Sequence, residues 1–199
     1  MILTSSKALE LLEESKGMGE SDRYIYHSIC VGNAAGKIAE ALSLDVDLAK
    51  TLGYIHDIGK RFGYAHEVAT HDIVGYEYIK ELGYDETYAN ICLTHSYLNN
   101  DINCVAGGVP NVSESKYEFR SEFVKNHEYT IYEKIINLCD IMCTTVNMTL
   151  EKRLIDIMKR RGVHSNTVYH ITEAQKLKEW MDETLGYNVY KLFPDVLKN

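Results

Sequence analysis

Residues 52–72, with the sequence LGYIHDIGKRFGYAHEVATHD, bring together the side chains best suited to metal or acid–base chemistry. The segment holds the adjacent pair His56-Asp57 and the hexapeptide HEVATH, which ends at His71. A zinc protease signature needs two histidines at i and i+4, because that spacing places both imidazoles on one helical face. His66 and His71 are five residues apart, which turns the second imidazole about 140° away from the first. The spacing therefore excludes a protease site and predicts that His66 is exposed.

His27, His71 and His95 lie at the apolar positions of three predicted helices. An unsatisfied buried polar group costs about 1–3 kcal/mol, so each buried imidazole needs a partner. That partner is either a backbone carbonyl for each histidine or a metal ion that the three share. The pair His56-Asp57 adds two candidate ligands, although adjacent residues on a helix point about 100° apart. The pair would therefore bind two ions, or one ion at a point where the helix ends.

Asp140 interrupts the apolar segment YEKIINLCDIMCTTV, where a carboxylate is unexpected. Burial of an unpaired carboxylate is very unfavourable. Asp140 therefore lies at the solvent-exposed edge of its helix, in a salt bridge, or on a metal ion, and the sequence leaves these three alternatives open.

The helices that must position these residues are predicted from apolar residues that recur at i, i+3, i+4 and i+7. No segment alternates as a β-strand would, and the chain has only two prolines, so we predict an all-α fold. The expected helices are 5–16, 22–42, 46–57, 65–82, 85–95, 116–126, 130–148, 150–161, 166–185 and 187–193. Residues 99–115 have the composition of a loop, and a loop of this length is typical of functional segments such as lids.

The composition and charge of the chain narrow its partners. It has 199 residues, of which 45% are apolar and 25% charged, and a formal net charge of −8. A basic face is required for nonspecific binding to nucleic acid or membranes, so we expect neither as a partner. An acidic protein that binds phosphate must place its cations locally. The KRR run at 159–161 is assigned to a helix end, where cations interact favourably with the helix dipole.

Two features predict a cytoplasmic location. The chain has no run of about 18 apolar residues, and its N-terminal segment MILTSSKALELLEESKG is amphipathic and charged, unlike a secretory signal. The five cysteines are an odd number without a CxxC pair, which favours reduced thiols over a disulfide framework.

The order of the candidate ligands resembles the HD-domain superfamily of metal-dependent phosphohydrolases, whose signature is H…HD…D on a helical bundle. The matching segments are RYIYH, LGYIHDIGK and KIINLCD. The resemblance covers about residues 20–147 and implies a single HD-type bundle over 1–199, with the segment of about 150–199 as a C-terminal helical extension. The ligands, in order along the chain, are His27, His56, Asp57, His71, His95 and Asp140.

The resemblance also implies how these ligands are shared. One ion would be held by His27, the His56-Asp57 pair and Asp140, and Asp57 would bridge to a second ion on the other two histidines. Such a mixed nitrogen and oxygen set suits two divalent ions of Fe, Mn, Zn, Ni or Co better than Mg.

The chemistry expected of two such ions is phosphate hydrolysis. Two metals about 3.5–4 Å apart polarise a phosphoryl group and activate a bridging water. Asp57, His56 and Lys60 are the predicted catalytic residues. Arg23 precedes His27 by one helical turn on the same face, and Lys60 follows the HD pair, so both are predicted to contact the phosphate of a small substrate such as a nucleotide.

Within the superfamily, the segment IGKRFG after the HD pair lacks the acidic residues of the ppGpp hydrolases and single-metal nucleotidases. The single histidine of LTHS disfavours the cyclic-di-GMP hydrolases. The chain looks most like small bacterial HD proteins that include symmetrical diadenosine tetraphosphate hydrolases. A di-iron HD-type oxygenase is the alternative function, followed by a non-catalytic signalling scaffold, and the oligomeric state stays open.

Overall fold

The structure is a computed structural model that describes residues 1–19, 21–63, 70–108 and 114–197. Within these residues the chain forms nine α-helices and two short 3-10 helices without a β-strand, which confirms the all-α prediction. The elements are α1 (Ser5–Glu13), α2 (Arg23–Ala41), α3 (Val46–Ile55), η1 (Ile58–Phe62), α4 (His71–Glu81), α5 (Glu86–Thr94), α6 (Glu114–Asn126), α7 (Ile131–Met142), α8 (Leu150–Arg161), α9 (Thr167–Leu185) and η2 (Val189–Leu192).

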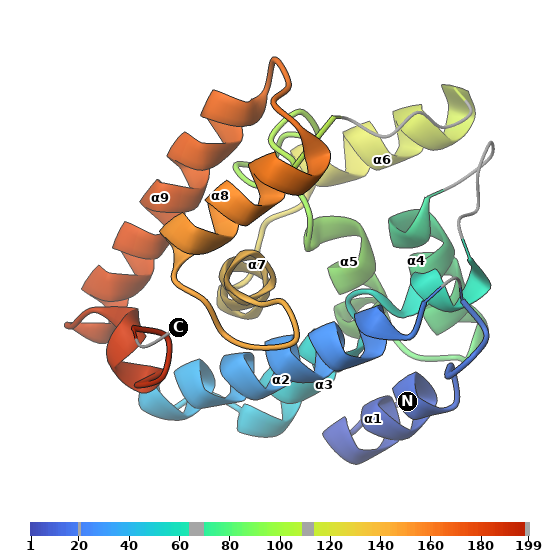
Figure 1. Cartoon of the computed structure of the whole chain (residues 1–199). Helices are drawn as coiled ribbons and strands as arrows, with labels where there is room; N and C mark the ends of the chain where they lie inside the picture. The colour runs from blue at the N-terminus through green and yellow to red at the C-terminus, as the bar shows by residue number, and fades with distance from the viewer. Residues whose placement is uncertain (20, 64–69, 109–113, 198–199) are drawn as a thin grey trace.

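Helix α7 lies at the centre of the arrangement and touches helices from both halves of the chain. It packs against α2, α3 and α5, and also against α8 and α9. Figure 1 shows α7 end-on, with α8 and α9 on one side and α2 and α3 on another. One buried apolar cluster extends from Leu3 to Val196 and therefore includes the first and last parts of the chain. The C-terminal helices thus pack directly on the helix that carries Asp140, while a single domain over 1–199 stays a prediction.

Glycines allow the backbones around the central pair of helices to approach closely. A Cβ atom on Gly53 of α3 would collide with the backbone of Gly32 on α2. A Cβ atom on Gly59 of η1 would collide with the carbonyl oxygen of His71. The glycine of the HDIGK segment therefore lets η1 cross the first turn of α4, and this crossing brings His71 close to Asp57.

Two predicted helices are too long because the backbone leaves helical geometry near the candidate ligands. Helix α3 ends at Ile55, and Asp57 then adopts φ −103° and ψ 12° before η1 begins. Helix α7 ends at Met142, since Cys143 is extended with φ −107° and ψ 144°. The prediction of a helix over 130–148 is therefore wrong for its last six residues.

The remaining boundaries agree with the sequence expectations within a few residues where the structure describes them. The predicted helix 65–82 is represented by α4, and its residues 65–69, including His66, lie outside the described part of the chain. The predicted loop 99–115 has no helix between residues 99 and 108, while α6 already begins at Glu114. Within the described residues, no helix is both long and apolar enough to cross a membrane.

Candidate metal centre

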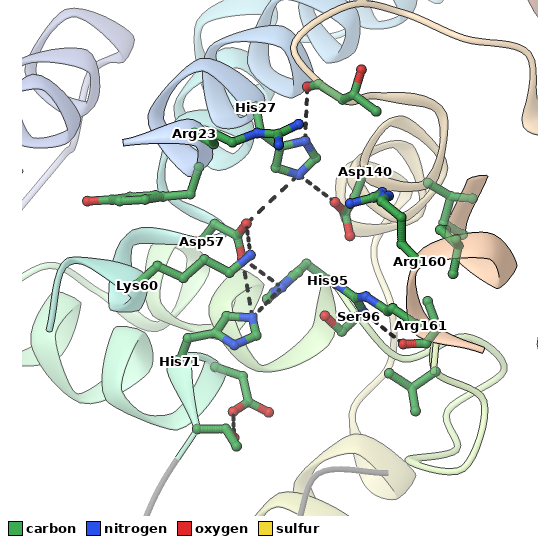
Figure 2. A pocket seen from close by; sticks show the side chains of 18 of the residues that line it. Arg23, His27, Asp57, Lys60, His71, His95, Ser96, Asp140, Arg160 and Arg161 are labelled. Atoms are coloured by element: carbon green, nitrogen blue, oxygen red, sulfur yellow. Dashed lines mark hydrogen bonds and ion pairs between the residues drawn. The ribbon is translucent and has the colours of Figure 1, made fainter. Parts of the chain in front are cut away.

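Figure 2 shows the predicted ligands His27, Asp57, His71, His95 and Asp140 around one shared space, and buried His56 joins them with its Nε2 3.3 Å from Nε2 of His27. His27 comes from the second turn of α2, and the His56-Asp57 pair lies between α3 and η1. Residue 71 is the first of α4 and residue 95 is the C-cap of α5. Asp140 comes from the last turn of α7. His27 and Asp140 are 113 residues apart in the sequence. The packing of α2 against α7 brings them together.

Asp57 stands between two groups of histidines and presents a different oxygen to each. Its Oδ2 lies 3.8 Å from Nε2 of His27 and 3.6 Å from Nε2 of His56. Its Oδ1 lies 3.2 Å from Nε2 of His71 and 3.4 Å from Nε2 of His95. Within each of the two groups, the candidate ligand atoms all lie within 4.8 Å of one another. This geometry is that of a carboxylate able to bridge two cations.

Asp140 adds a second carboxylate to the first group. Its Oδ1 lies 2.8 Å from Nε2 of His27 and 3.7 Å from Nε2 of His56. Of the alternatives that the sequence left open, the structure shows the pairing: this carboxylate is 24% exposed toward the cavity and contacts two imidazoles, while binding of a metal ion stays a prediction.

Three of the histidines use the other ring nitrogen, Nδ1, to contact backbone carbonyls. These contacts are 3.2 Å from His27 to Thr144, 2.7 Å from His56 to Gly53 and 2.9 Å from His95 to Cys92. A neutral imidazole that donates from Nδ1 keeps an unprotonated Nε2, and this orientation is the usual one for a metal-binding histidine. The sequence left open whether a backbone carbonyl or a metal ion satisfies each buried histidine. The two are compatible, because the carbonyl contacts Nδ1 and leaves Nε2 for a metal ion.

The contacts around Asp57 and the histidine pairs fit a cation. The Oδ1 atom of Asp57 is buried and makes no hydrogen bond. The Nε2 atoms of His27 and His56 are 3.3 Å apart, as are those of His71 and His95. Because the Nδ1 atoms of His27 and His56 both contact carbonyls, the Nε2 atoms of this pair face each other as lone pairs, which is unfavourable without a shared cation. A donor set of four imidazoles and two carboxylates matches divalent transition metals.

The ionisation states of the site also favour cation binding. Burial lowers the pKa of His56 and of His71, which keeps both imidazoles neutral. Burial opposes ionisation of Asp57, but Lys60 and the neighbouring imidazoles outweigh it and hold the pKa of this carboxyl well below its usual range. Burial likewise opposes ionisation of Asp140, while its histidine partners hold its pKa well below the usual range. Neutral imidazoles and charged carboxylates are the forms that bind metal.

His95 behaves differently from the other buried histidines. Burial lowers its pKa, but the charged Asp57 carboxylate 3.4 Å away outweighs that effect, and the pKa is raised overall. A proton on this imidazole and a cation beside Asp57 would therefore compete for the same carboxylate.

A cavity of about 810 Å³ opens onto the ligands. Arg23 and Lys60, the two residues predicted to contact phosphate, both line this cavity. The Lys60 ammonium pairs with Oδ2 of Asp57. The structure thus brings both cations to the predicted place, and their contact with phosphate stays a prediction.

The sequence analysis missed several residues that line the same cavity. Arg153, Arg160 and Arg161 come from α8, and His170 comes from α9. The KRR run was noticed, but it was assigned to a helix end because nothing in the sequence places α8 beside Asp140. Buried Asp72 was also left without a role; it accepts a 2.7 Å hydrogen bond from the hydroxyl of Tyr97.

An all-α arrangement with two His/Asp groups that share one aspartate defines a metal-binding helical protein with an open cavity at its ligands. The chain belongs to the HD-domain family, the superfamily of metal-dependent phosphohydrolases, because the family model of the HD domain matches residues 24–145. The resemblance inferred from the sequence is therefore confirmed. Comparison with curated proteins and comparison with solved structures each found no match. Helices α8 and α9 lie outside the matched segment.

Proposed function

We propose that this protein is a metal-dependent phosphohydrolase that acts on a small phosphate ester or anhydride, such as a nucleotide. The observation that carries the proposal is the position of Asp57 between two groups of histidines, with one carboxylate oxygen toward each group. This arrangement suits two cations, and two-cation sites are typical of phosphoryl transfer to water. The cations of the cavity wall support the same chemistry.

The residues that would hold the ions are the six predicted ligands, with Asp57 as the bridge. When bound, a pair of divalent Fe, Mn, Zn, Ni or Co ions supplies Lewis acidity for a phosphoryl group and for water. His56 is fully buried and its Nδ1 is engaged by Gly53. Its remaining nitrogen faces the ligand group, so its role is to hold a cation rather than to exchange a proton with the substrate.

Lys60 and Arg23 would bind and orient the phosphate. The Lys60 side chain is 35% exposed and pairs with the Asp57 oxygen that faces His27 and His56. A cation in that group takes over the negative charge of Asp57, which leaves the ammonium available to donate hydrogen bonds to a phosphate oxygen. Arg23 is the first residue of α2, the helix that also carries His27, and it lines the same cavity. Its guanidinium can therefore hold a phosphate that lies in the cavity.

Metal analysis combined with an activity panel tests this function. Purified protein should contain close to two transition-metal ions per chain and should release phosphate from members of a nucleotide and phosphoester panel in the presence of Mn or Fe. The proposal fails if the protein binds less than one ion tightly and none of the five metals supports phosphate release.

A matched pair of variants tests the predicted phosphate contact. Arg23→Ala should raise KM by about ten-fold, the order expected for the loss of a hydrogen bond between charged groups. Lys16→Ala is the control, because this lysine is exposed and lies outside the metal-site cavity. An unchanged KM in Arg23→Ala would remove this residue from the proposal without affecting the metal site.

A di-iron oxygenase is the second candidate, because a set of four imidazoles and two carboxylates also suits iron. Anaerobic purification followed by Mössbauer spectroscopy separates the two functions. A mixed-valent di-iron centre that consumes O2 would favour the oxygenase, whereas phosphate release without O2 favours the hydrolase.

A further inference from the structure

Helix α8 places a second group of cations on the wall of the metal-site cavity. Arg153, Arg160 and Arg161 all line this cavity together with the candidate ligands. Figure 2 shows Arg160 on the side of Asp140 and Arg161 on the side of Ser96, both across the site from Lys60. Cations of the cavity therefore stand on two sides of the ligands, and those of α8 come from a helix outside the segment that matches the HD-domain family.

The local contacts of these arginines hold them in place and neutralise only part of their positive charge. Arg153 is buried and donates from Nε to the Cys143 carbonyl at 3.1 Å and from Nη1 to Asp156 at 2.6 Å. Arg160 contacts the same carboxylate through Nε at 3.1 Å and through Nη2 at 2.6 Å. Arg161 donates from Nη1 to the Ala106 carbonyl at 2.8 Å. Two guanidinium groups thus share the Asp156 carboxylate and the third is bound to a backbone carbonyl, which leaves an excess of positive charge on this wall of an acidic protein.

The helix dipole explains why the last turn of α8 is basic. It does not explain which of the basic side chains face the cavity. Cations are favoured in the last turn of any helix, and Lys159, Arg160 and Arg161 all lie in the last turn of α8. Among them, only the two arginines line the cavity. Arginine also differs from lysine in that its planar group binds a phosphate through two parallel hydrogen bonds. The selection of arginine for the cavity side points to an anionic ligand.

The size of the cavity indicates that such a ligand reaches beyond the metal groups. At about 810 Å³, it falls within the range of about 300–1,000 Å³ typical of sites that enclose nucleotide-sized molecules. One phosphate at Asp57 would occupy only the part of the cavity near Lys60 and leave the α8 wall unused.

We propose that Arg160 and Arg161 form a second anion site that binds a distal phosphate of the substrate. The preferred substrates would then carry at least two phosphate groups, with the reacting one at the His/Asp groups and another at α8. This inference rests on the proposed phosphohydrolase function and names the substrate class for it. It also assigns the choice of substrate to the C-terminal extension, while the HD-domain segment supplies the metal ligands.

Binding of non-hydrolysable probes tests the second site directly. Straight-chain alkane monophosphonates and α,ω-bisphosphonates of the same chain lengths would be titrated into the full-length, Mn-loaded protein by isothermal calorimetry. The bisphosphonate of the best length should bind about 10- to 100-fold more tightly than its monophosphonate, as expected for charge-assisted hydrogen bonds from arginine. The ratio of the two affinities is the measured quantity.

Four variants of the same helix turn locate the effect. Arg160→Ala and Arg161→Ala should each bring the affinity ratio close to one, and Arg161→Lys should restore part of it. Lys159→Ala removes the same charge from the adjacent position but should keep the wild-type ratio. Thermal melting of each variant verifies folding, and buried Arg153 is left intact because it holds the Cys143 carbonyl.

The inference is overturned if mono- and bisphosphonates bind equally at every chain length, if neither binds, or if Lys159→Ala lowers the ratio as much as the arginine variants do. Hydrolysis of the matching phosphate esters is measured in parallel. A preserved, arginine-dependent bisphosphonate preference without any phosphate release would contradict the phosphohydrolase proposal and support the second anion site.

Discussion

Acidification should destabilise the protein through His170, a histidine of α9 at the wall of the metal-site cavity. Its side chain is buried, and burial lowers its pKa from 6.5 to about 4, with Asp140 opposing and Arg161 reinforcing the effect. Because the folded pKa is lowered, the imidazole contributes no pH dependence above pH 6.5. As the pH falls below 6.5, the unfolded state takes up the proton first, and stability is lost until the pH passes about 4.

The magnitude follows from the difference between the two pKa values. A difference of about 2.5 pKa units corresponds to about 3 kcal/mol in full, of which about 2 kcal/mol is lost between pH 8 and pH 5. Urea unfolding of the wild type and of His170→Gln, both with a chelator present, isolates this contribution because the other histidines titrate in both proteins. The free-energy difference between the two proteins should shrink by about 2 kcal/mol over that interval. Parallel stability curves for the two proteins would refute the reasoning.

Three further predictions concern the metal site. Asp57→Asn should reduce bound metal to at most one ion per chain, measured by plasma mass spectrometry, since a neutral amide replaces the charge that both groups share; two retained ions would contradict the bridging role. Gly59→Ala should lower the free energy of unfolding in urea by about 1–3 kcal/mol, because the added Cβ collides with the His71 carbonyl. Gly108→Ala is the control and should lower it less, because a Cβ there makes only ordinary van der Waals contacts. Mn at about a hundred times its Kd should raise Tm by about 5–10 °C relative to chelator-treated protein; an unchanged Tm would show that the folded site binds no ion.

The all-α fold and most helix positions were predictable because they depend on short-range patterns. The apolar period of 22–42 and the capping box of Thr130 with Glu133 are local signals that the structure reproduces. The sequence analysis missed the end of α7 although residues 143–147 (CTTVN) are weaker helix formers than those before them, because propensity alone does not determine where a helix stops. The chain leaves the helix there, and the carbonyl of Thr144 becomes the partner of Nδ1 of His27. That contact joins residues far apart in the sequence, and no local pattern encodes it.

The candidate ligands were identified by type and order, and their division into two groups followed from the family resemblance, because the residue pattern alone does not give it. The sequence left open whether His56-Asp57 serves one ion at a helix end or two ions. The structure shows the helix end and the two-sided carboxylate, because α3 ends just before the pair and the backbone at Asp57 turns its carboxylate toward both groups, while the number of ions stays a prediction. The direction of a single carboxylate depends on one φ/ψ pair, which side-chain periodicity does not determine.

The orientation of the α8 arginines toward the cavity could not be predicted from the sequence. A basic run at a helix terminus has a sufficient local explanation in the helix dipole, so composition offers no reason to look further. Whether such a run faces solvent or a cavity depends on the rotation of α8 on α7, which is determined by buried contacts such as Leu154 and Arg153. That rotation separates Arg160 and Arg161 from Lys159, and the separation is a property of packing between elements. If the distal phosphate site exists, substrate choice in this protein was therefore determined by how an extension packs on the HD-domain segment rather than by the motif that identifies the family.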